Sequence, residues 1–327
     1  MKEFLVFLAL ASASSGTGIK YDGLKVKFGI SHTGADKEYF FTIPRTISEA
    51  QGAGWTRTVR PEGPLKELLL YCPPGKMVCP LYYNNTDGFV AGLQIAAPLA
   101  SIGPALNPQK YFVRWNTSAT SDEPAQEFWT ATQYYVSEDS LKAGVGPTKE
   151  NGSTLQGNGV WVQGLDGNLM RIQPFEAEIN KTDFTKQNCV RNMGTHYYLN
   201  MTRRLGCEKQ ILPWFPLVKN GTLLGVGFQT FGKKPIIDAE TLKNQKDFYE
   251  DLPKDRKAPL DAIPLAPECF LDLSQKYGRL SIHIYYISKP WEINCAHGDS
   301  VNSARLNQST VLVTFFAALC LAWRSLA

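Results

Sequence analysis

Apolar and polar residues alternate along most of the chain. A period of two places successive side chains on opposite faces of a strand, so each alternating segment predicts a strand. Strands at this density, with few helical patterns, predict a mainly β, disulfide-stabilised architecture of the β-sandwich or jelly-roll type. The segments are residues 24–30, 38–43, 68–72, 88–95, 109–115, 127–136, 159–163, 169–172, 195–199, 222–231 and 280–287.

Turn residues and two helical patterns complete the predicted secondary structure. Asn, Asp and Gly at residues 85–88, 166–168 and 220–221 separate apolar runs and tolerate the backbone conformations of hairpin turns. Helical periodicity is convincing only at residues 239–251 and 268–276. We therefore expect one or two short helices.

One polar stretch marks an internal boundary. Residues 137–158 are rich in Gly, Ser, Pro and Lys, which predicts a linker at 141–158. It would join an N-terminal β region, 14–140, to a C-terminal β region, 159–302, as two β subdomains or as parts of one. A second polar stretch, residues 243–261, mixes both charge signs and is expected to be an exposed loop.

Both ends of the chain carry the pattern of processing signals. Lys2, a short apolar run and then small residues predict a secretory signal peptide, residues 1–13. At the other end, small residues, a polar spacer and an apolar tail predict a GPI-anchor signal propeptide, residues 303–327. Asn302 or Ser303 is the expected GPI attachment residue. A short transmembrane segment or an amphipathic terminus is the alternative for this tail.

The motif for N-glycosylation recurs through the body of the chain. Recurrence in a chain with a signal peptide predicts a glycoprotein in which each occupied acceptor faces solvent. A further motif at Asn307 falls in the predicted propeptide. The acceptors are Asn84, Asn116, Asn151, Asn180, Asn200 and Asn220.

Cysteine usage agrees with secretion. The chain has seven cysteines, and one of them, Cys320, lies in the predicted propeptide. The other six predict three disulfides, for which fifteen pairings are possible. No two are spaced as Cys-x-x-Cys, which disfavours a thiolate metal site. The simplest pairing is sequential: Cys72 with Cys79, Cys189 with Cys207, and Cys269 with Cys295.

The net charge argues against two functions, nucleic-acid binding and mineral nucleation. The formal charge is +4, from 34 basic and 30 acidic residues. This near balance argues against nucleic acid as a partner, and equally against an acidic polyelectrolyte that nucleates mineral.

The chain lacks the sequence motifs of the common enzyme classes, such as the nucleophile elbow, the P-loop and His-Glu-x-x-His. Two histidines remain as candidate site residues, because each lies in a predicted strand among aromatic residues. The strand period groups His196 with Tyr198 and Asn200, and His283 with Ser281 and Tyr285. Both therefore fall on the more polar face of their strands, which favours a surface cleft.

These two histidines leave three interpretations open. Imidazoles from neighbouring strands bind zinc or copper when a third ligand from Asp, Glu or Tyr converges on them. Without that ligand, His196 and His283 are structural residues or serve another binding role. The chain has no His-x-His pair, and His32 and His297 lie in predicted loops. No cofactor is therefore predicted apart from this possible copper or zinc ion.

Tryptophan is abundant for a β core. An exposed ring in a cleft stacks on sugars or anchors a partner protein, although most rings are expected in the core. The segments 213–216 and 289–295 are expected to be rigid, proline-pinned turns that expose a ring. The tryptophans in question are Trp115, Trp129, Trp161, Trp214 and Trp291.

Four segments resemble a family of uncharacterised secreted proteins of marine and other invertebrates, some of which occur in the skeletal organic matrix of corals. The segments are residues 193–198, 213–216, 223–229 and 283–295, and the resemblance covers roughly residues 155–297. It implies an extracellular or matrix location and assigns a role to no residue. The near-neutral charge departs from the very acidic proteins of mineral matrices.

Together these patterns predict a GPI-anchored glycoprotein of the cell surface or extracellular matrix with a binding or structural role, including that of a biomineral matrix component. Its expected partners are an extracellular protein, a glycan or a matrix component, and the membrane through the anchor. A secreted copper- or zinc-dependent enzyme using His196 and His283 is the first alternative. A glycan-binding protein is the second.

Overall fold

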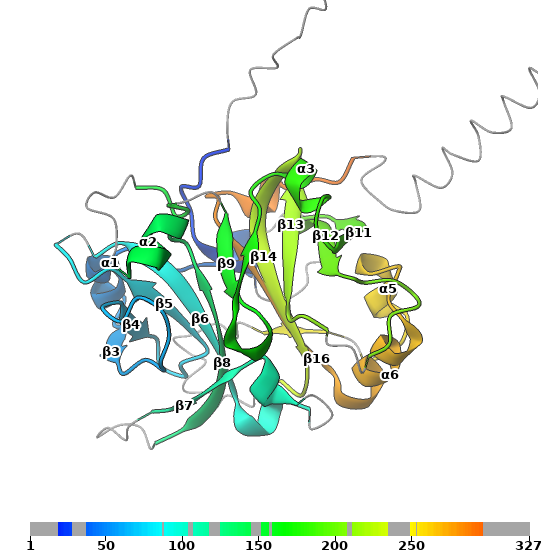
Figure 1. Cartoon of the computed structure of the whole chain (residues 1–327), viewed down its shortest axis with the longest axis horizontal. Coiled ribbons are helices and arrows are strands. Elements are labelled where there is room, and N and C mark those ends of the chain that lie inside the picture. The colour runs from blue at the N-terminus through cyan, green and yellow to red at the C-terminus, as the bar shows by residue number, and fades with distance from the viewer. Residues whose placement is uncertain are drawn as a thin grey trace, which may run out of the picture.

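The computed structural model describes residues 19–27, 37–86, 88–103, 107–117, 125–144, 152–156, 159–207, 211–234, 249–252 and 254–296. The predicted signal peptide, the anchor signal with Asn302 and Ser303, Asn151, His32 and His297 lie outside these residues. Two antiparallel eight-stranded sheets form a sandwich, which confirms the predicted fold class (Figure 1).

One sheet, called sheet A, combines the first strands of the chain with the last ones. Its strands are β1 (Lys25–Lys27), β2 (Phe40–Thr42), β11 (Phe184–Val190), β12 (Gly194–Leu199), β13 (Trp214–Lys219), β14 (Thr222–Phe231), β15 (Glu250–Asp251) and β16 (Arg279–Tyr285). Their order is β11-β12-β13-β14-β16-β1-β2, and β15 also pairs with β16.

The other sheet, called sheet B, holds the strands between them. They are β3 (Thr56–Thr58), β4 (Leu69–Cys72), β5 (Val78–Tyr82), β6 (Val90–Pro98), β7 (Val113–Asn116), β8 (Glu127–Tyr134), β9 (Val160–Gln163) and β10 (Leu169–Ile172). Their order is β10-β9-β8-β6-β5-β4-β3, with β7 also pairing β8. The predicted linker at 141–158 does not separate the sheets, because β9 and β10 follow it and still pair within sheet B.

The helices are short. They are α1 (Ile47–Gly52), α2 (Glu138–Ala143), α3 (Glu176–Ile179), α5 (Ala258–Ala262) and α6 (Glu268–Tyr277), with 3-10 turns at Lys37–Tyr39, Leu99–Ser101, Pro108–Lys110, Leu165–Gly167 and Pro290–Glu292. The predicted helix at 268–276 is α6, which follows Pro267 and ends at Gly278, where φ is +84°. Of the other predicted helix, residues 239–248 lie outside the described ranges, and Glu250–Asp251 is strand β15.

The main core fills the space between the sheets. The hydroxyl of Tyr286 in sheet A donates to Gln133 Oε1 in sheet B at 2.6 Å, which fixes the two sheets to each other. Trp214 is fully buried and begins β13, so the turn predicted at 213–216 is wrong. Its Nε1 donates to the backbone carbonyl of Gln163 at 2.9 Å. Other members of this core are Val26, Tyr82, Leu93, Val160, Val226, Ile282 and Ile284.

A second layer covers the outer face of sheet A. Helices α5 and α6 lie on the side of this sheet that faces away from sheet B (Figure 1). Phe231 of the sheet packs edge to face on Phe270 of α6, with ring centroids 5.0 Å apart. This layer covers most of the outer face of sheet A. The two histidines predicted in strands lie on this face and are therefore buried.

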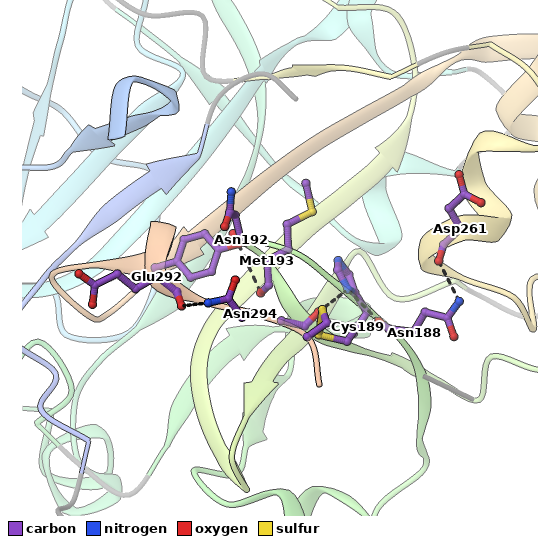
Figure 2. The surroundings of a disulfide bond; sticks show 11 residues. Asn188, Cys189, Asn192, Met193, Asp261, Glu292 and Asn294 are labelled. Atoms are coloured by element: carbon purple, nitrogen blue, oxygen red, sulfur yellow. Dashed lines mark hydrogen bonds between the residues drawn. A yellow bond between two sulfur atoms is a disulfide. The ribbon is translucent and has the colours of Figure 1, made fainter. Parts of the chain in front are cut away.

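Three disulfides hold the chain together: Cys72–Cys79, Cys189–Cys295 and Cys207–Cys269. The presence of three disulfides and the first pairing were predicted correctly, and the other two sequential pairings are wrong. The segment after β16 returns to the β11–β12 turn, where the N–H of Asn192 donates to the carbonyl of Ile293 at 2.9 Å. This return brings Cys295 to Cys189 (Figure 2).

Candidate functional site

Four polar side chains form a continuous buried cluster on the outer face of sheet A. The Nε2 atoms of His196 and His283 lie 3.3 Å apart. The Nδ1 atom of His283 lies 2.9 Å from Glu250 Oε1, and the same oxygen lies 3.4 Å from the Nζ atom of Lys27. Because β12, β16, β15 and β1 each supply one residue, the cluster exists only in the folded sheet.

The register of β16 explains this convergence. His283 is opposite Lys27 on β1, and Ser281 is opposite Glu250 on β15, so both partners lie along one edge of β16. Ser281 and His283 point away from the sandwich, whereas Ile282 points into its core, as the period of two predicts.

This face is not the open surface cleft that the sequence analysis expects. His196 is 1% exposed and His283 is 4% exposed. The reason is the layer above them: the Asn188 amide of β11 donates to the Asp261 carbonyl of α5 at 2.9 Å and fixes the helix over the sheet (Figure 2).

An aromatic floor orients the two imidazoles. Gly227 on β14 is opposite both His283 and Phe215, and a Cβ atom at Gly227 would lie 1.9 Å from Phe215 Cζ. The missing side chain therefore lets the Phe215 ring lie over the strand. This ring stacks on His196 at 5.5 Å and on Tyr198 at 4.7 Å, and meets His283 edge-on at 5.3 Å between centroids.

The hydrogen-bond partners determine where the ring protons lie. The Nδ1 atom of His196 lies 3.1 Å from the carbonyl of Gly194 and 3.3 Å from that of Asn188. Carbonyl oxygens only accept, so this Nδ1 carries a proton and donates. The Nδ1 atom of His283 donates in the same way to the Glu250 carboxylate. The Nε2 atoms, on the other side of each ring, face each other.

Burial sets the charges in the cluster. It lowers the pKa of His196 to about 3, helped by the nearby charge of His283, so this imidazole is neutral at pH 7. Burial alone would raise the pKa of Glu250, but His283 and Lys27 outweigh that effect, and the pKa lies below its usual value. Glu250 is thus an ionised carboxylate.

A cavity of about 290 Å³ borders the cluster. Ser281 is part of its lining, with Glu250 opposite it on β15 and Gln229 opposite it on β14. Arg279 and His283 flank Ser281 along β16, so larger polar side chains surround a small one. The covering residues include Ala262 and Ile263, which are apolar. Asp261 of α5 also lines the cavity, so a polar floor faces a mostly apolar roof with one acidic residue.

The third metal ligand that the sequence analysis expects is not found among the described residues. Within these ranges, no group of three or more His, Cys, Asp or Glu side chains is placed to hold a metal ion. Glu250 bonds His283 through Nδ1, on the opposite side of that ring from His196. The structure thus brings His196 and His283 together and leaves the metal prediction untested.

The glycosylation acceptors lie where modification requires them. All five predicted acceptors that the structure describes are exposed. Asn180 follows α3, Asn200 follows β12, and Asn220 lies in the turn between β13 and β14. Asparagine side chains at such positions are open to the secretory machinery. The exposed acceptors are Asn84, Asn116, Asn180, Asn200 and Asn220.

Tryptophan offers little to a partner in the described part of the molecule. Trp115 and Trp214 are buried, and Trp129 and Trp161 are half-buried. Trp291, also half-buried, lies in the turn predicted at 289–295. Its ring has the ammonium groups of Lys25 and Lys37 at 5.6 Å each.

Sequence reasoning missed Glu250, the residue that links the cluster. It belongs to the stretch 243–261, which was expected to be exposed, yet Tyr249 and Glu250 are each 1% exposed. The signal that could have found this strand is the pair Phe248–Tyr249, which is aromatic within an otherwise charged stretch.

These features define a class of protein: a disulfide-bonded β-sandwich with a buried His-His-Glu-Lys cluster beside a cavity. Comparison of the chain with protein-family models, curated proteins and solved structures finds no match in any of the three. The three disulfides fit an extracellular or secreted protein. Across the described ranges, no helix has the length and apolar character needed to cross a bilayer.

Proposed function

We propose that this protein is an N-glycosylated, GPI-anchored component of the cell surface or extracellular matrix with a binding role. The observation that carries the binding role is the cavity on the outer face of sheet A. The disulfides and the exposed acceptors support the compartment, because both belong to the secretory pathway.

The polar floor distinguishes this cavity from a packing defect. Empty spaces inside proteins are normally apolar, since buried polar groups are hydrogen-bonded. Here Glu250 Oε2 and Arg279 Nε are buried with no hydrogen-bond partner within the described residues. A ligand or water that hydrogen-bonds these two atoms would recover part of the about 1–3 kcal/mol that each unmade bond costs.

The size of the cavity limits the ligand. A volume of about 290 Å³ is at the lower end of small-molecule sites, which run from about 300 to 1,000 Å³. The cavity therefore accepts a small molecule, or one terminal group of a matrix protein or glycan.

Two measurements test the location. The full chain, produced in a secretory host, should leave the cell surface on treatment with phosphatidylinositol-specific phospholipase C. Its mobility should increase after removal of N-glycans. Retention in the membrane after phospholipase treatment would contradict the anchor.

A cavity-filling substitution tests the binding role. The purified protein is applied to arrays of glycans and extracellular-matrix components, and Ala262→Phe should abolish any saturable binding. Ala53→Phe is the matched control, because Ala53 is exposed at the end of α1. Equal binding by both variants would place the binding site elsewhere. Absence of saturable binding to every component would count against this role.

One observation favours the alternative of a metal-dependent enzyme, namely the convergence of the two histidine Nε2 atoms. The metal content of the purified chain distinguishes this alternative, since an enzyme of this kind needs a bound ion.

A further inference from the structure

We propose that His196 and His283 bind one transition-metal dication, zinc or copper(II), between their Nε2 atoms, with its remaining coordination positions open to the cavity. This inference does not depend on the binding role proposed above. It rests on the separation of the two nitrogens, on the partners of the opposite ring nitrogens, and on the cavity beside them.

The separation of the two nitrogens fits two ligands of one ion. Zinc binds imidazole nitrogen at about 2.0–2.1 Å with tetrahedral geometry, which places two such nitrogens about 3.3–3.4 Å apart. The Nε2 atoms of His196 and His283 are 3.3 Å apart. An ion at this distance from both nitrogens lies to one side of the line that joins them, so each ring turns to aim its lone pair at the ion, while the separation of the nitrogens stays the same.

The opposite ring nitrogens have the partners that metal-binding histidines need. A ligating histidine normally donates its other N–H to a carboxylate or a backbone carbonyl, which fixes the tautomer and raises the basicity of the ligating atom. His283 donates to Glu250, and His196 donates to the carbonyls of Gly194 and Asn188. Each Nδ1 thus has an acceptor, so both Nε2 atoms can bind a metal ion once it displaces any proton that lies between them.

Two facing lone pairs repel each other unless something positive lies between them. A shared proton and a metal ion are the two candidates. A shared proton would make the pair an imidazolium, whose charge is stabilised only in part by the Glu250 carboxylate, because that carboxylate is also paired with Lys27. A metal ion instead gains from both nitrogens and from ligands in the cavity, which borders both rings.

The chain itself supplies two ligands from its described part, so the site is open. Water or a small anion from the cavity would complete the coordination. Arg279 and Asp261 both line the cavity and carry opposite charges, so the lining accepts either water or an anion such as chloride. The probe used to test the site is therefore the metal alone, in chloride buffer.

The experiment uses the full chain, purified without a histidine tag from a secretory host and stripped with EDTA. Zinc binding is measured by calorimetry and elemental mass spectrometry, and copper(II) binding by electron paramagnetic resonance. We expect one ion per chain and a copper spectrum with hyperfine splitting from imidazole nitrogen. His196→Gln and His283→Gln should each weaken zinc binding at least tenfold and remove that splitting.

Two further variants serve as controls. His32→Ala/His297→Ala removes the two other imidazoles of the chain and should leave binding unchanged. Glu250→Gln keeps both ligands but alters the partner of His283, so it should weaken binding about 10- to 100-fold; because it also removes the ion-pair partner of Lys27, its binding is compared with that of Lys27→Met/Glu250→Gln. Circular dichroism identifies any variant that fails to fold, and the other His→Gln variant then decides the result.

The proposal is overturned if the unmodified chain binds no zinc or copper above background, which would mean that a proton joins the two histidines. It is also overturned if both His→Gln variants bind as tightly as the unmodified chain. Neither result affects the array experiment with Ala262→Phe, so the two proposals fail separately.

Discussion

The ammonium group of Lys27 lies 3.4 Å from the carboxylate of Glu250, although 223 positions separate the two residues in the chain. Their side chains are 3% and 0% exposed. β1 and β15 meet here on the same edge of β16, so a buried ion pair joins the first strand to the strand before α5.

Breaking this pair from one side should destabilise the fold strongly. Lys27→Met removes the ammonium and leaves the Glu250 carboxylate buried, with His283 as its remaining partner in the cluster. Loss of one partner from a buried ion pair costs about 3–5 kcal/mol. The expected decrease in the free energy of unfolding is measured by urea denaturation.

The double variant Lys27→Met/Glu250→Gln should recover most of that loss, because it removes both charges. Lys25→Met is the matched control, since Lys25 is only partly buried and donates to Thr42 at an exposed site. A loss for Lys25→Met equal to that for Lys27→Met would show that the ion pair is not the cause.

A single methyl group at Gly227 should disturb the aromatic floor. The Cβ atom of Gly227→Ala would overlap the Phe215 ring, and overpacking of this kind costs about 1–3 kcal/mol. The double variant Gly227→Ala/Phe215→Ala should lose less stability than the sum of the losses of the two single variants, because the clash needs both groups. Thermal unfolding of the unmodified chain, the two single variants and the double variant measures this difference. Gly52→Ala, which meets no atom within 4 Å, should not destabilise.

The alternation of the sequence predicted eleven of the sixteen described strands, because these strands have a core side and an outer side, and it missed β3, β5, β11, β13 and β15. On β16, Ile282 and Ile284 point into the sandwich and His283 points away, as the period of two requires. The period does not show what covers the outer face. Without knowing that α5 and α6 lie there, we expected a cleft where the structure has a buried cluster.

The errors share a physical cause, which is that contacts between distant segments override local signals. Pro213–Pro216 reads as a turn, yet Trp214 is held in β13 by the core of the other sheet. Glu250 was predicted in a solvated stretch, yet it is buried and bonded to Lys27 and His283. The pairing of Cys189 depends on the path of the chain after β16, which local sequence does not encode.

The disulfides should differ in their contribution to stability. In the chain-entropy account, the Cys189–Cys295 bond closes a loop of 106 residues and contributes about 4–5 kcal/mol, whereas Cys72–Cys79 closes a loop of 7 and contributes about 2–3 kcal/mol. Cys189→Ala/Cys295→Ala should therefore lower the melting temperature more than Cys72→Ala/Cys79→Ala. Peptide mapping that found Cys189 joined to Cys207 would contradict the observed pairing.

The free energy of unfolding should depend on pH through His196. In the folded protein its pKa is about 3, whereas an unfolded histidine titrates near 6.5. Below pH 6.5 the unfolded chain binds a proton that the folded chain excludes, so this contribution to stability is complete above pH 6.5 and decreases as the pH falls towards 3. The free energy of unfolding should fall by about 1.4 kcal/mol for each pH unit below 6.5, which is a loss of about 2 kcal/mol at pH 5.

Glu250 does not contribute to the pH dependence of the free energy of unfolding between pH 6.5 and 4.5. Its folded-state pKa is also lowered, from 4.5, so the stability that it contributes is lost only as the pH falls below 4.5. Between pH 6.5 and 4.5 we therefore attribute the slope to His196, and His196→Gln should reduce it. The measurement is urea unfolding at pH 7, 6 and 5 with EDTA present, so that no metal ion competes with protons. An equal slope in His196→Gln and in the unmodified chain would show that other groups, and not this buried imidazole, control the acid sensitivity.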